Sequence, residues 1–255
     1  MINTEAKNEW FVQLSKSTEA KLYLYCFPFA GGSSNVFRRW PLFVPAGVEV
    51  VPVEIPGHGK RLQEQPFSNL FELVEKMGAE IGAMLRQPFA FLGHSMGALL
   101  AFELTRFLRR QKLPMPRQLF VSAHVAPHTP SLREPIYGLP EKEFIARLQE
   151  INGTPQQVLQ NDELRALFLP ILRSDFKLCE TYEYKESLTF DFPITAFCGD
   201  ADADVEPQHM EAWSTHTMSM FNMHVVSGDH FFIQSAEQEF FHILRKELNT
   251  LINKL

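Results

Sequence analysis

The stretch FLGHSMGALL (Phe91–Leu100) places a serine between two glycines, after an apolar run and before a helical one. Ser95 forms a G-x-S-x-G pattern with Gly93 and Gly97. Two interpretations compete: the glycines only permit a tight strand-to-helix turn, or the turn presents the serine hydroxyl to a substrate. The apolar strand before Ser95 and the apolar helix after it are the context of a nucleophile elbow, which favours the second.

Outside this turn, apolar strand-like runs alternate with helical periodicity. The predicted strands are Lys21–Phe27, Val48–Glu54, Pro88–Gly93, Arg117–Ala123, Pro193–Gly199 and Met220–Ser227. Several are nearly continuous hydrophobic runs, as in parallel strands that are covered on both faces. Amphipathic helices are predicted over Leu70–Leu85, Ala98–Arg109 and Glu237–Leu251. This alternation predicts an α/β fold with a mostly parallel, doubly wound sheet.

One stretch, from Leu139 to about Lys185, contains two or three helical patterns and no strand. Its segment LRALFLPILRSDFKLCETY (Leu164–Tyr182) has one apolar face, although Pro170 is expected to bend or divide the helix. The stretch is either extra core or a helical cap over the ligand-binding edge of the sheet. Its place after the fourth α/β repeat favours the cap, at about residues 135–187 within a single domain over 1–255.

Composition limits the function classes. The chain has 255 residues, a formal net charge of −6 and 45% hydrophobic residues, which gives no electrostatic case for a nucleic-acid or anionic-membrane partner. No apolar segment is long enough for a signal peptide or a membrane span, so we expect a cytoplasmic protein. Three cysteines lack a CxxC spacing, and we expect Cys26 and Cys198 to be packed in the core.

A serine nucleophile needs a base and an acid that orients the base. His230, in SGDHFFIQ between the last strand and the last helix, is the predicted base. The turn CGDADADV offers three acids, and its G-x-x-D-x-x-V spacing favours Asp202, with Asp200 and Asp204 as alternatives. Asp229 is predicted to cap its loop.

Other histidines of the chain are not predicted to act as the base. Packing is expected for His94, a structural role for His224 and His242, and a place at the pocket rim for His124 and His128.

The loop FPFAGGSSNVFRRW (Phe27–Trp40) contains the candidate for a second oxyanion donor. Gly31 and Gly32 let the backbone approach a ligand closely. The amide of Ala30 is therefore predicted to form an oxyanion hole with the amide of Met96, which lies at the start of the helix after the serine. The loop can equally be a plain turn with a serine helix cap, and both can hold together.

The chain resembles the α/β-hydrolase type II thioesterases that accompany nonribosomal peptide and polyketide synthases. The resemblance rests on FPFAGGSSNVFRRW, EIPGHGKRLQEQP, GHSMG and GDHFFI, which together reach from near residue 25 to near 235. It implies hydrolysis of acyl thioesters on the phosphopantetheine arm of carrier proteins, to edit or release chains. The sequence departs from the family pattern at Pro56-Gly57-His58-Gly59, where PGRG is usual, and we expect this difference to have a structural effect.

The resemblance also implies roles for individual residues. Ser95 is the nucleophile, Asp202 the orienting acid and His230 the base, while Ala30 and Met96 supply oxyanion amides. The implied pocket includes Phe29, Gly31 and Phe231. No metal and no cofactor are implied, because the phosphopantetheine belongs to the partner carrier protein, and family members often act as monomers. The alternatives are a medium-chain acyl-ACP or acyl-CoA thioesterase, a general carboxylesterase, and a non-catalytic module that binds carrier proteins.

Overall fold

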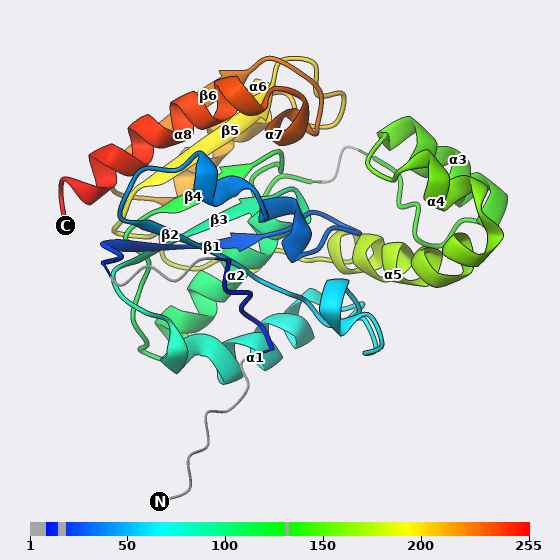
Figure 1. The fold of residues 1–255 in the computed structure, drawn as a ribbon, viewed down its shortest axis with the longest axis horizontal. Coiled ribbons are helices and arrows are strands. Elements are labelled where there is room, and N and C mark those ends of the chain that lie inside the picture. The colour runs from blue at the N-terminus through cyan, green and yellow to red at the C-terminus, as the bar shows by residue number, and fades with distance from the viewer. Residues whose placement is uncertain (1–8, 15–18, 131–132) are drawn as a thin grey trace, which may run out of the picture.

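A six-stranded, wholly parallel sheet forms the centre of the protein (Figure 1). The computed structural model describes residues 9–14, 19–130 and 133–255. Each predicted strand is present in the sheet order β2-β1-β3-β4-β5-β6: β1 (Leu22–Phe27), β2 (Val48–Pro52), β3 (Phe89–His94), β4 (Leu119–Ser122), β5 (Ile194–Gly199) and β6 (Phe221–Val226). The predicted α/β architecture is therefore confirmed.

Helices connect the strands and cover the sheet. Their bounds are α1 (Leu70–Ile81), α2 (Met96–Arg110), α3 (Glu141–Ile151), α4 (Gln156–Gln160), α5 (Asp162–Glu180), α6 (Pro207–Glu211), α7 (Phe232–Ser235) and α8 (Glu237–Ile252). Within the described part of the chain, no helix is both long enough and apolar enough to cross a bilayer.

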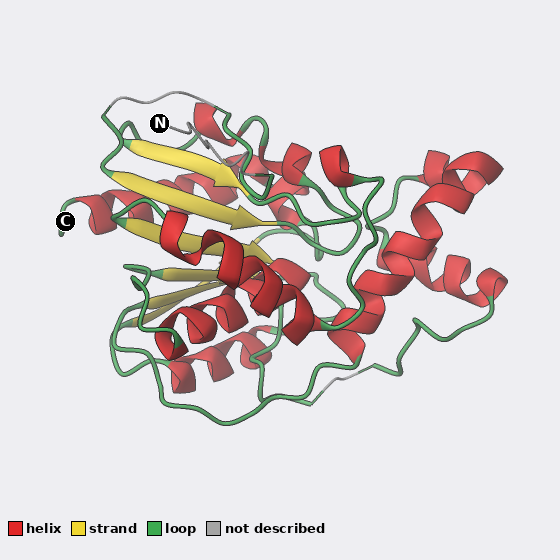
Figure 2. Ribbon diagram, turned by 90° about the horizontal axis from the view of Figure 1, so that it is seen from below, coloured by secondary structure: helices red, strands yellow, loops and turns green. Residues whose placement is uncertain are grey.

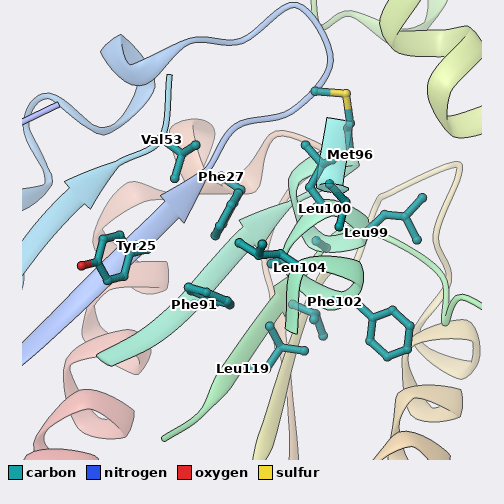
Figure 3. Close-up of a cluster of buried hydrophobic side chains, with 14 of the residues drawn as sticks. Tyr25, Phe27, Val53, Phe91, Met96, Leu99, Leu100, Phe102, Leu104 and Leu119 are labelled. Atoms are coloured by element: carbon teal, nitrogen blue, oxygen red, sulfur yellow. The ribbon is translucent and has the colours of Figure 1, made fainter. Parts of the chain in front are cut away.

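The two faces of the sheet pack against different helices. Alternate residues of a strand point to opposite faces, so Leu24 and Cys26 of β1 pack with α8, whereas Tyr25 and Phe27 pack with α1 and α2. Figure 1 shows α8 on one side of the sheet and α1 and α2 on the other. Figure 3 shows the second layer, in which Phe27 and Phe91 lie against the leucines of α2. Cys26 and Cys198 are buried, as predicted.

Between β4 and β5 the chain leaves the sheet and forms α3, α4 and α5. In Figure 2 the strand arrowheads point toward these helices, which lie beyond the carboxyl edge of the sheet. They share a small apolar cluster of their own, which includes Phe144, Leu148, Leu159 and Leu172. We call α3–α5 the helical insertion.

Pro170 lies inside α5, which runs without a break over 19 residues. Of the two expected effects of Pro170, a bend or a division of the helix, the division is therefore excluded. Proline removes one backbone donor, and the carbonyl of Pro170 accepts a hydrogen bond from the Ser174 hydroxyl at 2.9 Å. Burial of Leu169 before the proline and of Ile171 and Leu172 after it stabilises the helix across this position.

Phe91→Ala tests the core beneath the serine turn. Phe91 is fully buried in β3 and contacts the rings of Tyr25, Phe27 and Phe89. Removing the ring leaves a cavity, so the free energy of unfolding should fall by about 3–5 kcal/mol in urea denaturation. Leu188→Ala is the control because Leu188 is 82% exposed, and it should change stability by less than about 0.5 kcal/mol.

Candidate active site

Ser95 sits in a sharp turn between β3 and α2. Its backbone has φ 53° and ψ −121°, a conformation that non-glycine residues rarely adopt. The Ser95 amide donates to the carbonyl of Ser122 at 2.7 Å, which fixes the turn to the end of β4. The hydroxyl is therefore held at the carboxyl edge of the sheet.

The two glycines of the motif are required by close backbone contacts. A Cβ on Gly93 would lie 2.1 Å from the carbonyl oxygen of Gly97. A Cβ on Gly97 would lie 2.1 Å from the carbonyl oxygen of Phe27 at the end of β1. The glycines thus allow the tight turn that the sequence pattern predicts.

The structure brings Ser95, His230 and Asp202 into one chain of hydrogen bonds. His230 Nε2 lies 2.9 Å from Ser95 Oγ, and His230 Nδ1 lies 2.8 Å from Asp202 Oδ2. A carboxylate can only accept, so Nδ1 carries the proton and Nε2 is free to accept from the serine hydroxyl. The Asp202 side chain is fully buried and that of His230 is 14% exposed.

Asp202 is held by the backbone of its own turn. Its Oδ1 accepts from the amides of Asp204 and Val205 at 2.8 and 3.1 Å, which leaves Oδ2 directed at the histidine. The other candidate acids are engaged elsewhere. Asp200 accepts from the Gly228 amide, and Asp204 forms an ion pair with Arg133.

The loop that carries His230 is braced from both sides. Asp229 accepts from the Phe231 amide at 2.9 Å, in agreement with its predicted role as a loop cap. On the other side, the buried His94 ring packs against His230 and Phe232, with ring centroids 5.6 Å apart in each pair. His94 Nδ1 lies 2.8 Å from the Ser122 hydroxyl. Burial lowers the pKa of His94 far below its usual range, so the ring is neutral.

A cavity of about 380 Å³ opens beside Ser95. The residues that line it include the predicted oxyanion residues Ala30 and Met96, and His230. Mostly apolar side chains from the helical insertion complete the wall, among them Leu148, Ile151, Leu172 and Phe176. The cavity therefore joins the serine to a pocket large enough for an acyl group.

Three residues were predicted from the sequence to form the substrate pocket. Phe29 and Phe231 line the cavity, with ring centroids 5.1 Å apart. Gly31 is not among the lining residues. Its amide donates to Asp175 of α5, and a Cβ on Gly31 would lie 2.5 Å from the Leu172 side chain. Gly31 thus contacts the helical insertion rather than the cavity.

The remaining histidines occupy separate positions. His124 and His128 line the cavity, as predicted for the rim. His224 lies on β6 and bonds Glu247 of α8 at 2.9 Å, which fits its predicted structural role. His242 is exposed on α8, where it lies opposite the apolar stripe of that helix.

A metal could reach part of this site. Asp202, Asp204 and His230 offer ligand atoms within 4.8 Å of one another. However, Asp202 Oδ2 and His230 Nδ1 already bond each other, and Asp204 pairs with Arg133. The hydrogen-bond pattern accounts for this cluster without a metal ion.

Sequence reasoning missed two buried carboxylates beside the loop that follows β1. Glu54 and Asp175 are 1% and 2% exposed, and both accept hydrogen bonds from backbone amides of this loop. The motif EIPGHG contains Glu54, but Asp175 is far from it in the chain and no local pattern links them.

Comparisons with known proteins agree with this geometry. A family model described as "Thioesterase domain" matches residues 23–248. The gramicidin S biosynthesis protein GrsT of Aneurinibacillus migulanus is 41% identical over 245 residues, which cover 96% of each chain. The solved structure of the type II thioesterase BorB from the borrelidin biosynthetic cluster matches with a TM-score of 0.85 and 32% identity, over 94% of this chain and 98% of BorB.

A second structure, the type II thioesterase YbtT from the yersiniabactin NRPS/PKS pathway, has a TM-score of 0.84 and 30% identity, over 95% of this chain and 99% of YbtT. The chain therefore belongs to the thioesterase family. The sequence-based resemblance to type II thioesterases and the predicted α/β-hydrolase fold are confirmed.

Two buried histidines predict how stability depends on pH. Burial lowers the pKa of His216 to about 4 and that of His94 far below its usual range. In the unfolded chain both have the ordinary pKa of about 6.5, so the unfolded state binds more protons below that pH. The free energy of unfolding should therefore fall as the pH drops from about 6.5 toward 4. Urea denaturation across this range measures it.

The variant His216→Asn should weaken this pH dependence, because one of the rings whose pKa is lowered by burial is removed. His242→Asn is the matched control, since His242 is exposed. An equal pH dependence in wild type and His216→Asn would contradict the assignment.

Proposed function

We propose that this protein is a type II thioesterase of nonribosomal peptide or polyketide biosynthesis, in which Ser95, His230 and Asp202 form the catalytic triad. Family membership supports thioester hydrolysis. The observation that carries the triad is the continuous hydrogen-bonded chain from Ser95 Oγ through the His230 ring to Asp202. Its acyl thioester substrates are carried on the phosphopantetheine arm of carrier proteins.

Acylation begins when Ser95 attacks the thioester carbonyl. His230 Nε2, 2.9 Å from the hydroxyl, accepts the serine proton as the bond to carbon forms. The ring then carries a positive charge, which the buried Asp202 carboxylate stabilises through Nδ1. The thiolate is a good leaving group, so it departs with less need for protonation than an amine. The departing sulfur takes the proton from the His230 imidazolium, which returns the ring to the neutral form that can act on water.

The oxyanion of the tetrahedral intermediate is stabilised by the amides of Ala30 and Met96. Both residues line the cavity beside Ser95, and Met96 is the first residue of α2, where backbone amides are unsatisfied within the helix. One such donor can contribute about 3 kcal/mol of barrier reduction. Water activated by His230 then hydrolyses the acyl-serine and restores the hydroxyl.

The helical insertion acts as a cap on a single α/β-hydrolase domain. Its side chains form much of the cavity wall, so it shapes the acyl pocket. The prosthetic arm comes from the carrier protein, and these steps use protein groups alone. Cytoplasmic location and a monomeric state remain predictions from the sequence.

Substitutions in the triad should show that Ser95 and Asp202 are needed for turnover. Ser95→Ala should abolish turnover and reaction with a fluorophosphonate, because the nucleophile is lost. Asp202→Asn should lower kcat by up to ~10⁴-fold, since an amide no longer selects the productive histidine tautomer. Mass spectrometry of the labelled peptide and steady-state kinetics provide the two measurements.

Asp200→Asn is the matched control on the same turn, because Asp200 bonds the Gly228 amide rather than the histidine. It should retain kcat within a few-fold. Full activity in Ser95→Ala would remove Ser95 from the mechanism.

Substrate preference distinguishes the carrier-dependent enzyme from the alternatives. The expected order of kcat/KM is acyl-carrier protein first, acyl-CoA second and p-nitrophenyl ester last, because only the first presents both the arm and the protein surface. A preference for simple esters by orders of magnitude would instead indicate a general carboxylesterase. Equal rates with acyl-CoA and acyl-carrier protein would favour the medium-chain acyl thioesterase.

A further inference from the structure

A buried carboxylate links the helical insertion to the loop that supplies the Ala30 amide. We call residues 28–34, which follow β1, the oxyanion loop. Asp175 Oδ2, on α5, accepts a hydrogen bond from the Gly31 amide at 2.7 Å. The same oxygen lies 2.8 Å from His58 Nε2. The side chains of Asp175 and His58 are each 3% exposed, so the pair is shielded from water.

The surroundings of His58 determine its charge. Nε2 faces the Asp175 carboxylate, and Nδ1 lies 3.1 Å from the carbonyl oxygen of Pro56. Both neighbours can only accept, so both ring nitrogens are satisfied only when both carry protons. Burial alone would lower the pKa of His58, but the charge and hydrogen bond of Asp175 outweigh it and raise the pKa above 6.5. His58 is therefore held as an imidazolium.

The far end of the oxyanion loop is held by a second carboxylate. Glu54 accepts from the Ser34 amide at 3.0 Å and from the Ser34 hydroxyl at 2.7 Å. It also accepts from the Lys60 amide at 3.2 Å. The loop is thus fixed at Gly31 by Asp175 and at Ser34 by Glu54, with Ala30 next to the first attachment.

The helix α5 also contacts this loop by packing. A Cβ on Gly31 would lie 2.5 Å from Leu172 Cδ2, so the helix and the loop are in direct contact. Gly31 has φ +75°, a backbone conformation that would be strained in a residue with a side chain. A shift of Asp175 would therefore move the peptide that joins Ala30 to Gly31, because the Gly31 amide of this peptide bonds Asp175.

We propose that Asp175 is a positioning residue for the oxyanion hole, and that the imidazolium of His58 holds Asp175 in place. The proposal rests on the oxyanion role of Ala30 given above. It explains the departure at Pro56-Gly57-His58-Gly59: where the family pattern has a permanently charged arginine, this chain has a group that loses its charge at higher pH.

The pH dependence has a definite sign. Asp175 on α5 and Glu54 after β2 are the charged groups that act most on His58, and both favour its protonated form. Arg61 lies nearby in the same connection, but its guanidinium packs over Trp10 and bonds Glu64. The ion pair is present below the raised pKa of His58 and is lost as the pH rises through it. The turnover number should decline over the same interval.

The test compares kcat and KM for an acyl-CoA thioester across neutral and alkaline pH. Wild type should show an alkaline decline in kcat with little change in KM. His58→Arg should keep its kcat over this range, because arginine stays charged. Asp175→Asn and His58→Gln should lower kcat by ~10-fold at pH values where wild type keeps the ion pair, less than the loss of a whole oxyanion donor. The difference between wild type and His58→Gln should shrink at alkaline pH, where His58 itself loses its charge.

A matched control separates positioning from general stability. His224 and Glu247 form another partly buried histidine–carboxylate pair, on β6 and α8, with Nε2 2.9 Å from Oε1. His224→Gln should lower the midpoint of thermal unfolding but leave kcat and its pH profile unchanged. If Asp175→Asn and His58→Gln fail to fold, the pH profile of kcat in wild type compared with that in His58→Arg still tests the proposal.

The outcomes distinguish this inference from the proposed function. An alkaline decline that is identical in wild type and His58→Arg would overturn the role of His58. Wild-type kcat in folded Asp175→Asn would overturn the role of Asp175. In either case Ser95→Ala remains inactive if the triad is correct, whereas an active Ser95→Ala would refute the proposed function itself.

Discussion

The strained backbone of Ser95 is the constraint on which the rest of the site depends. Its φ of 53° is maintained because the Ser95 amide bonds the end of β4 and because Gly93 and Gly97 allow backbone contacts too close for any side chain. This turn fixes the hydroxyl at the carboxyl edge of the sheet and starts α2 beneath it. The loops after β1, β5 and β6 must place their residues around this fixed hydroxyl. The site therefore depends on the lengths and contacts of these loops more than on their local structure.

Buried carboxylates that accept backbone amides hold these loops. Asp202 bonds its own turn and directs the histidine, Glu54 holds Ser34, and Asp175 holds Gly31. The oxygens of a buried carboxylate can be hydrogen-bonded by backbone amides, so the group does not need a positively charged partner at each oxygen. It can therefore fix a loop where no regular structure exists. The arrangement also links the helical insertion, which contributes to the pocket wall, with the loop that contains Ala30, the proposed oxyanion donor.

Much of this could be predicted from local patterns. The strands are nearly continuous apolar runs because both faces of a parallel sheet are buried, and the serine turn has glycines at the positions where contact is closest. Asp202 could be favoured over Asp200 and Asp204 because the G-x-x-D-x-x-V spacing lets Val205 pack back before the next helix, and Val205 is buried. Two details differ from what was expected. Pro170 does not divide α5, because packing on both sides of it outweighs one missing donor. Gly31 faces α5 rather than the cavity.

The sequence by itself determined the alternation of strands and helices, the strained serine turn, and the order of serine, acid and histidine along the chain, because each depends on residues that are neighbours in the polymer. Only the tertiary structure decided that Asp175 meets His58 and Gly31, across 117 and 144 positions. Burial, charge state and hydrogen-bond partners at that junction arise from three segments packed together. No local pattern encodes them, since the contact exists only after the helical insertion has docked against the carboxyl edge of the sheet.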